Sequence, residues 1–231
     1  MLDRVRRQRE SRRRKAQRDA AAQRHGAWIR EHRRLEAFLE TARSPEGRSG
    51  AEGRTPLGEG ELLYHSLAGS LVKAGRAPSQ PVGLDEGWGP EVVGRVLRRE
   101  GTPPNAYVQR ENVPPPVDSG RILVTSRRVL FEGRGLLREW RLSELDGVVH
   151  DAELPWTALQ TDDDGSISGL SCDAVAIEDF RFRLALAVAL AGESPTAGLA
   201  PGQARARLIQ IAEARVAAHE AERPAVPDLD G

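Results

Sequence analysis

The stretch Ser119–His150 limits the possible folds more than any other part of this chain. It holds two strand-like runs, Ile122–Thr125 and Arg128–Glu132, then a turn over Gly133–Gly135 and a third run, Leu136–Leu142. β-branched and aromatic residues fill the runs, whereas Gly, Ser and Asp lie between them, as in strands joined by short turns. The stretch therefore predicts a meander of short antiparallel strands.

Alternation within these runs predicts which side chains face a core. Successive side chains of a strand point to opposite faces, so Val129 and Phe131 point one way and Leu130 the other. Trp140 and Trp156 each alternate with polar neighbours. Because large aromatic side chains contribute most when buried, we expect both tryptophans in the core rather than on a ligand platform.

The same stretch resembles a known family. Its pattern is Gly-x-Ile-x-Val-Thr-x-x-Arg-Val-x-Phe, followed by Arg-Glu-Trp, by Pro-Trp-Thr and by Phe-Arg-Phe-Arg-Leu-Ala-Leu-Ala. The matching residues are Gly120, Val124, Thr125, Arg128, Phe131, Arg138, Glu139, Trp140, Pro155, Trp156, Thr157 and the run that begins at Phe180. Over roughly residues 58–192 they are similar to bacterial pleckstrin-homology-like (PH-like, GRAM-related) domains, most of all to an uncharacterised actinobacterial group.

The resemblance implies a strongly bent antiparallel β-sheet, or partial barrel, whose open end is capped by a C-terminal helix. It implies no particular ligand, because this fold hosts lipid, peptide and protein binding alike. The predicted fold class is therefore α+β, with a long basic helix before the PH-like domain and an extra helix after it.

Gly and Pro divide the chain into segments. Residues 1–43 contain one Gly and no Pro and predict a helical basic arm. Residues 44–57 are predicted to be a flexible linker, and residues 58–192 the β-domain. A C-terminal helix is predicted over 203–223, followed by a frayed tail over 224–231.

Several further elements are predicted inside the β-domain. Residues 76–118 are expected to be an irregular insertion with a short helix near 90–100. A first strand or strand pair is predicted over Glu61–Ala74, with a helix as the alternative. The other predicted elements are strands at Pro155–Gln160, Ile167–Leu170 and Ala174–Ile177, and a helix over Glu178–Ala191.

Composition restricts the cellular setting. A single cysteine, Cys172, excludes an intrachain disulfide and fits a reducing compartment. No apolar run approaches the roughly 20 residues of a membrane span, and the arginine-rich N-terminus does not resemble a secretory signal. We therefore expect a cytoplasmic protein, and association with a membrane surface stays open.

The net charge of zero hides an asymmetry. Residues 1–43 hold 14 basic and 6 acidic residues, and the remainder has the opposite excess. Such an arm either seeks an anionic partner or folds back on its own acidic domain. The cations singled out in the arm are Arg6, Arg7, Arg12, Arg13, Arg14 and Lys15.

The second half of the arm carries an apolar stripe at helical spacing: Trp28, Leu35, Phe38 and Leu39. We expect this docking stripe to pack on the protein's own domain or to pair with a second copy as a coiled coil. Insertion into a membrane interface is the alternative.

No catalytic or metal-binding motif is found in the sequence. The five histidines are widely spread and never paired with cysteine at zinc spacing. Neither a Gly-x-Ser-x-Gly elbow nor a phosphate-binding glycine loop is present. The acidic run Asp162–Gly165 lacks the later ligands of a calcium loop and predicts a hairpin turn. No enzyme activity, metal or cofactor is expected.

Two adjacent arginines, Arg127 and Arg128, are the candidate ligand-binding residues. Neighbours on a strand diverge, so they are expected to face different surroundings. One interpretation is capture of an anion, either a lipid headgroup or an acidic peptide. The interpretation that we favour is a structural ion pair of Arg128 inside the domain.

These observations favour a non-catalytic cytoplasmic binding module that docks a protein or peptide partner. The first alternative is peripheral attachment to anionic lipid through the basic helix and the PH-like domain. It is weakened because Glu61–Ala74 holds only Lys73, where phosphoinositide-binding domains have a basic hairpin. The second alternative is nucleic-acid contact through the basic arm.

Overall fold

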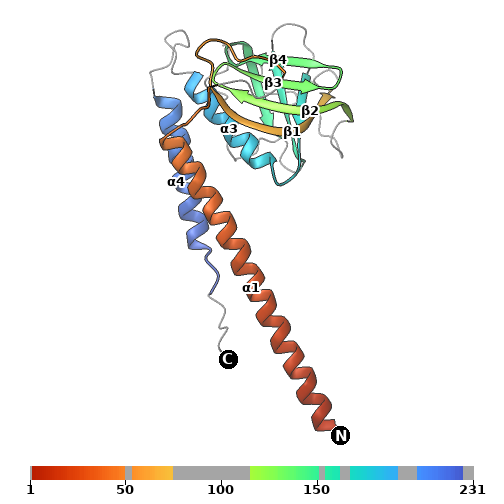
Figure 1. The fold of residues 1–231 in the computed structure, drawn as a ribbon. Coiled ribbons are helices and arrows are strands. Elements are labelled where there is room, and N and C mark those ends of the chain that lie inside the picture. The colour runs from red at the N-terminus through yellow and green to blue at the C-terminus, as the bar shows by residue number, and fades with distance from the viewer. Residues whose placement is uncertain are drawn as a thin grey trace, which may run out of the picture. The chain divides into compact units, whose positions relative to one another are not determined.

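A computed structural model describes residues 2–49, 54–74, 115–150, 154–161, 167–191 and 202–225 (Figure 1). It confirms the predicted α+β class: long helices at both ends of the chain and an antiparallel sheet between them. The chain divides into two compact units. The helical unit comprises Met1–Arg43 and Gln210–Gly231, and the sheet unit comprises Ser44–Ile209.

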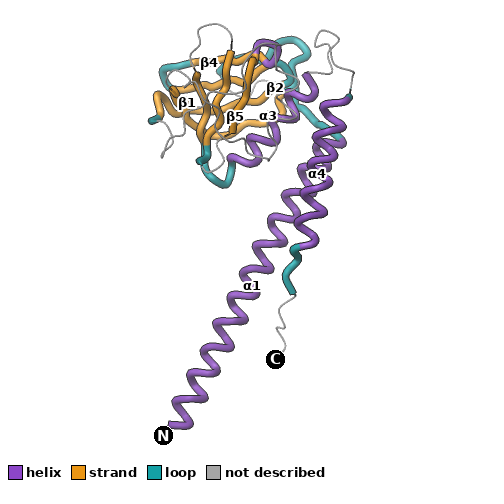
Figure 2. Tube along the Cα trace, turned by 180° about the vertical axis from the view of Figure 1, so that it is seen from behind, coloured by secondary structure: helices purple, strands orange, loops and turns teal. Residues whose placement is uncertain are grey.

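Seven antiparallel strands form one curled sheet in the order β4-β3-β2-β1-β7-β6-β5. The strands are β1 (Leu63–Ala74), β2 (Pro116–Thr125), β3 (Arg128–Gly133), β4 (Leu137–Arg141), β5 (Leu145–His150), β6 (Trp156–Thr161) and β7 (Ile167–Ser171). A short 3₁₀ helix, η1 (Leu142–Glu144), joins β4 to β5, and helix α3 (Ile177–Ala191) follows β7. This curled sheet with its C-terminal helix is consistent with a PH-like fold (Figure 2).

Strand β1 belongs to both halves of the sheet. It pairs with β2 along most of its length and with β7 over Ser70–Ala74. Gly69 lies where the second pairing begins. A Cβ atom at Gly69 would collide with the Ile122 side chain and approach the Ser171 carbonyl oxygen to 2.8 Å. Only glycine allows the backbones to approach so closely, and this permits the sheet to curl.

Helix α3 packs on the inner face of the curl, against β1, β2 and η1. Phe131 and Trp140 are both buried in this core, and Trp140 is only 1% exposed. Trp156 is 5% exposed. The prediction that the two tryptophans lie in the core is therefore confirmed. Apolar burial of this kind is the main stabilising term for such a domain.

The predicted strand Ala174–Ile177 is wrong. These residues form a turn that leads into α3, and β7 is the last strand. The Asp173 carboxylate accepts a hydrogen bond of 2.8 Å from the Val175 amide, and its carbonyl oxygen accepts one from Ile177. Asp173 therefore accepts hydrogen bonds from amides of the turn that leads into the helix. The apolar run at 174–177 favoured a strand on the sequence alone.

Other boundaries also differ from those predicted. Residues 61–74 contribute one strand rather than a pair, and β2 begins at Pro116, inside the predicted insertion. The predicted short helix at 90–100 and the predicted turn at 162–165 lie outside the described residues.

The outer face of β2 and β3 is covered as well. Residues 54–62, here called the strap, cross this face, and Leu57 packs on a cluster of Leu63, Leu123 and Leu130. Leu130 is therefore buried although it points away from Phe131, and side chains on both faces of β3 are buried.

The strap overlaps the segment predicted as a flexible linker, and this prediction needs correction. Arg48 and Leu63 exchange two backbone hydrogen bonds of 2.9 Å, and Leu57 covers the sheet. The Gly- and Pro-rich composition hid one apolar side chain and the backbone pairing that hold the segment in place.

In the helical unit, α1 (Leu2–Arg43) is continuous through Gly26. Helix α4 (Gln203–Ala221) runs antiparallel to it, because Arg43 pairs with Glu213 and His32 with Glu220. Among the described residues, no helix has both the length and the apolar character needed to cross a membrane.

Candidate functional site

Arg128 is held between two carboxylates. Its Nε and Nη2 atoms donate to the two oxygens of Glu61 at 2.8 and 3.0 Å, and Nη1 donates to Glu139 at 2.8 Å. Nη2 also donates to the Pro56 carbonyl oxygen. The ion pair favoured for Arg128 on the sequence is therefore present, and its guanidinium is already occupied by groups of the same chain.

Glu61 is the most buried member of this cluster, with a side chain that is 2% exposed. Burial by itself raises the pKa of its carboxyl. Hydrogen bonds from Arg128, Thr125 and the Gly58 amide outweigh burial and hold the pKa below its usual range. Glu61 is therefore ionised at neutral pH and fixes this end of the strap.

Arg127 faces different surroundings, as expected for strand neighbours. It is exposed, and its guanidinium lies near Gly58 and Gly60. In the described part of the chain it makes no ion pair. The structure therefore does not bring Arg127 and Arg128 together around one ligand.

A second carboxylate fixes the other end of the strap. Glu132 accepts hydrogen bonds from the amides of Thr55 at 2.6 Å and Arg54 at 3.1 Å, and the Arg54 guanidinium donates to the Gly133 carbonyl oxygen. Burial raises the pKa of Glu132, but the hydrogen bonds from Thr55 and Arg54 outweigh it, so the pKa lies below its usual range. The negative charge of Glu132 is thus directed at the strap.

Beyond the strap, no described residue covers the outer face of the sheet. A shallow groove of about 1010 Å³ lies over β1, β2 and β3. Small side chains form its floor, since Ser66, Ala68 and Ser119 project on the same face as Arg121. We call this surface the sheet groove; its charged side chains are those of Arg54, Arg121, Glu132 and Arg134.

The sheet groove is basic. Arg121 and Arg134 are exposed, and neither guanidinium has an acidic partner in the part of the chain that the structure describes. The Asp118 carboxylate makes no ion pair with either arginine among the described residues and instead accepts hydrogen bonds from the amides of Gly135 and Leu136 at 3.0 Å. Those bonds, the one from Gly135 first, lower the pKa of Asp118 and hold the turn that carries Arg134.

Apolar side chains flank the basic residues. Leu137 is 61% exposed, Val117 50% and Leu136 43%. Leu137 pairs with Glu132 across β3 and β4, and Val117 lies two residues from Ser119 on β2. The open half of the outer face therefore combines cations with exposed apolar surface, as interfaces often do.

Sequence reasoning missed the sheet groove. Arg54, Arg121 and Arg134 stand alone in three separate segments, and only strand register and the strap bring them together. The one local signal was the pair Gly120 and Gly133. These residues face each other across β2 and β3, and a Cβ on Gly120 would come within 2.7 Å of the Gly133 Cα.

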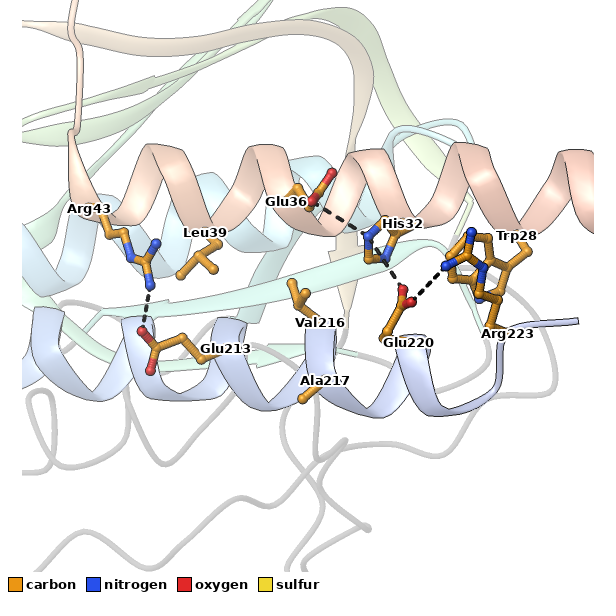
Figure 3. A pocket seen from close by; sticks show the side chains of 10 residues that line it. All are labelled: Trp28, His32, Glu36, Leu39, Arg43, Glu213, Val216, Ala217, Glu220 and Arg223. Carbon is orange, nitrogen blue, oxygen red and sulfur yellow. Dashed lines mark hydrogen bonds and ion pairs between the residues drawn. The ribbon is translucent and has the colours of Figure 1, made fainter.

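The docking stripe is used within the chain. A groove of about 600 Å³ lies between α1 and α4. Among the side chains that line it, Leu39 is directed toward Val216 (Figure 3). The Trp28 Nε1 atom donates to the His219 carbonyl oxygen at 3.0 Å. The stripe residues Leu35 and Phe38 are buried.

Aromatic stacking and charge join the same two helices. The Trp28 ring stacks on His32 and His219, with ring centroids 4.8 and 5.2 Å away, and Arg223 lies over its face. Figure 3 shows Trp28, His32 and Arg223 of this group. An ion pair of 2.8 Å links Arg43 to Glu213. Trp28 therefore serves as an anchor between α1 and α4.

The cations of the basic arm lie on α1. Arg12, Arg13, Arg14 and Lys15 have exposed side chains. Arg6 and Arg7 belong to the same helix, but their side chains lie outside the described set.

Two further titratable groups are buried in the sheet unit. Burial, helped by the charge of Arg181, lowers the pKa of His150 to about 3, and its Nδ1 lies 2.9 Å from the Thr157 hydroxyl. Burial raises the pKa of the Cys172 thiol to about 11. Both groups are therefore neutral at pH 7. The described residues contain no group of three or more side chains suited to a metal ion.

No family model matches the chain, and no curated protein matches it at a significant level.

Proposed function

We propose that this chain is a non-catalytic binding module of the PH-like family, whose sheet groove docks an acidic segment of a protein or peptide partner. One observation carries the proposal: Arg121 and Arg134 are exposed beside a floor of small side chains, while the Glu132 carboxylate accepts hydrogen bonds from the strap amides. The motif resemblance and the curled sheet support the family. The single cysteine supports a reducing, cytoplasmic setting.

The chemistry of the groove suits carboxylates. A guanidinium donates two parallel hydrogen bonds to a carboxylate, and such charge-assisted bonds are roughly twice as strong as neutral ones. The small side chains of Ser66, Ala68 and Ser119 let an extended backbone come close to the sheet. Leu137 adds apolar contact at the rim. An acidic segment with one or two apolar residues therefore fits this surface.

A membrane surface is the second candidate. It is favoured by the exposed apolar residues Val117, Leu136 and Leu137 beside Arg134, since interfacial attachment combines apolar insertion with attraction to anionic lipid. The acidic-segment proposal ranks first because the two groove arginines flank a polar floor rather than an apolar one.

The test uses a dye-labelled peptide of eight glutamates, titrated against the full chain by fluorescence anisotropy. The groove variant is Arg121→Glu with Arg134→Glu. Losing two charge-assisted contacts of about 1.5–3 kcal/mol each should weaken binding at least tenfold.

The matched control neutralises the arm: Arg12→Gln, Arg13→Gln, Arg14→Gln and Lys15→Gln. It changes the net charge by the same amount as the groove variant, so a purely electrostatic effect would appear in both. The proposal fails if the arm variant loses the peptide and the groove variant keeps it. Flotation with phosphatidylserine vesicles tests the second candidate, which requires vesicle binding that the groove variant loses.

A further inference from the structure

We propose that residues 12–24 of α1 form a docking surface for a B-form DNA duplex. These 13 residues hold six basic side chains and one acidic one, Asp19. The surface lies in the helical unit and shares no residue with the sheet groove.

No described residue covers this surface, because α4 ends before it. The last turn of α4 lies beside Trp28, where the His219 carbonyl oxygen accepts the indole hydrogen bond. In Figures 1 and 2, α1 continues well beyond that point toward its N-terminus. Every side chain from Arg12 to Asp19 is exposed.

The cations surround the helix instead of forming one stripe. A helix turns about 100° per residue, so Arg12, Arg13, Arg14 and Lys15 point in four different directions. A helix that lies in a membrane interface needs one face of large apolar side chains, and the apolar residues here are alanines. Charge on all sides instead suits a groove with phosphates along both walls.

The dimensions and the charge agree with the major groove of B-form DNA. That groove is about 12 Å wide and admits one α-helix of about 10–12 Å diameter. Thirteen helical residues span about 20 Å, and a duplex carries roughly twelve phosphates over that length. Each phosphate that the arm neutralises releases counterions, which drives binding without any base contact.

The antiparallel pair of α1 and α4 determines where the surface starts. Trp28 is hydrogen-bonded to the backbone of His219 and stacked on its ring, and Arg223 lies over the indole. An isolated helix of this length is marginal in water, and its like charges repel one another. The packed pair of α1 and α4 supplies a nucleus from which the helix extends, and DNA phosphates would relieve the repulsion between its cations.

The experiment titrates a dye-labelled 24-base-pair DNA duplex of arbitrary sequence with the full chain, over a series of potassium chloride concentrations. The wild-type affinity should fall steeply with salt. The arm variant with four glutamines should bind more weakly, and the slope of log K against log salt should shrink by about one for each lost phosphate contact. Because glutamine forms helices well, circular dichroism should show the helix retained.

The groove variant, Arg121→Glu with Arg134→Glu, should bind DNA as the wild type does. If the sheet groove fails to bind the acidic peptide, the DNA proposal for residues 12–24 still stands. If the arm fails to bind DNA, the proposal for the sheet groove still stands. Equal affinity and slope for the arm variant and the wild type would overturn the inference. So would arm-dependent binding to phosphatidylserine vesicles without binding to DNA. An A-form RNA duplex should bind more weakly because its major groove does not admit a helix, and equal affinity would overturn the placement in the groove.

Discussion

Arg128 and Arg121 project from the same outer face of the sheet, on adjacent strands, but their surroundings are opposite. The strap covers the half of the face that contains Arg128, and its Glu61 carboxylate meets the guanidinium in two hydrogen bonds. No described residue covers the half that contains Arg121, and its floor is made of small side chains. The covered half therefore uses arginine to hold the fold together, whereas Arg121 on the other half is exposed, and we propose that it contacts a partner.

The largest effect should come from the inner face, which both halves share. Phe131→Ala and Trp140→Ala should each lower the free energy of unfolding by about 3–5 kcal/mol, because each leaves a cavity in a fully buried core. Chemical denaturation measures this. Leu137→Ala, an exposed position on β4, is the control and should cost less than about 0.5 kcal/mol. Unchanged stability of both aromatic variants would show that the core lies elsewhere.

Arg128→Ala should destabilise by about 3 kcal/mol, because it leaves the buried Glu61 carboxylate without its cation. Arg121→Ala, on the open half, should change the free energy of unfolding by less than about 0.5 kcal/mol. Chemical denaturation of both variants measures these losses. Similar losses of unfolding free energy in the two variants would contradict the difference between the covered half and the half that contains Arg121.

The covered half should also respond to acid. The folded-state pKa of Glu132 lies below the ordinary 4.5, so its contribution is fully present above pH 4.5 and is lost as the pH falls through the folded value. His150 adds a separate loss between about pH 6.5 and 3. Glu132→Gln should therefore reduce the loss of stability below pH 4.5, where Glu61 and His150 still contribute, and leave the loss nearer pH 6 in place. An unchanged curve for the variant would mean that the strap amides do not stabilise the charge.

The smallest effect should come from the strap's apolar contact. Leu57→Ala should cost about 1–2 kcal/mol, because Leu57 is only partly buried and its site opens to solvent. Hydrogen exchange should show faster exchange of the Arg54 and Thr55 amides, which the strap holds on Glu132. Exchange rates equal to those of the wild type would show that the Leu57 side chain does not help to hold the strap on the sheet.

The sequence was sufficient where structure follows local pattern. Alternation placed Phe131 and Trp140 in the core, and the motif resemblance anticipated a bent sheet followed by a helix. The long arm followed from composition, since residues 1–43 hold a single glycine and no proline. Each of these features depends on residues close together in the chain.

The strap and the sheet groove could not be predicted because they depend on contacts between distant residues. Arg54 approaches Gly133 only when the strap lies on the sheet, and strand register alone places Ala68 beside Arg121. The misplaced strand at 174–177 has a local cause: the side chain of Asp173 and the turn that it stabilises outweighed a short β-branched run. The partner of Trp28 was equally hidden, because His219 lies at the other end of the chain.

The central position of β1 has a consequence for the order of folding. Ser70 pairs with Ser119 and with Ser171, about 50 and about 100 residues later in the chain. The ribosome therefore releases β1 long before either partner exists, and closing such distant contacts is slow. The meander β2-β3-β4 and the meander β5-β6-β7 pair locally and can form first. We expect β1 to pair last and thereby to join the two preformed meanders into one sheet.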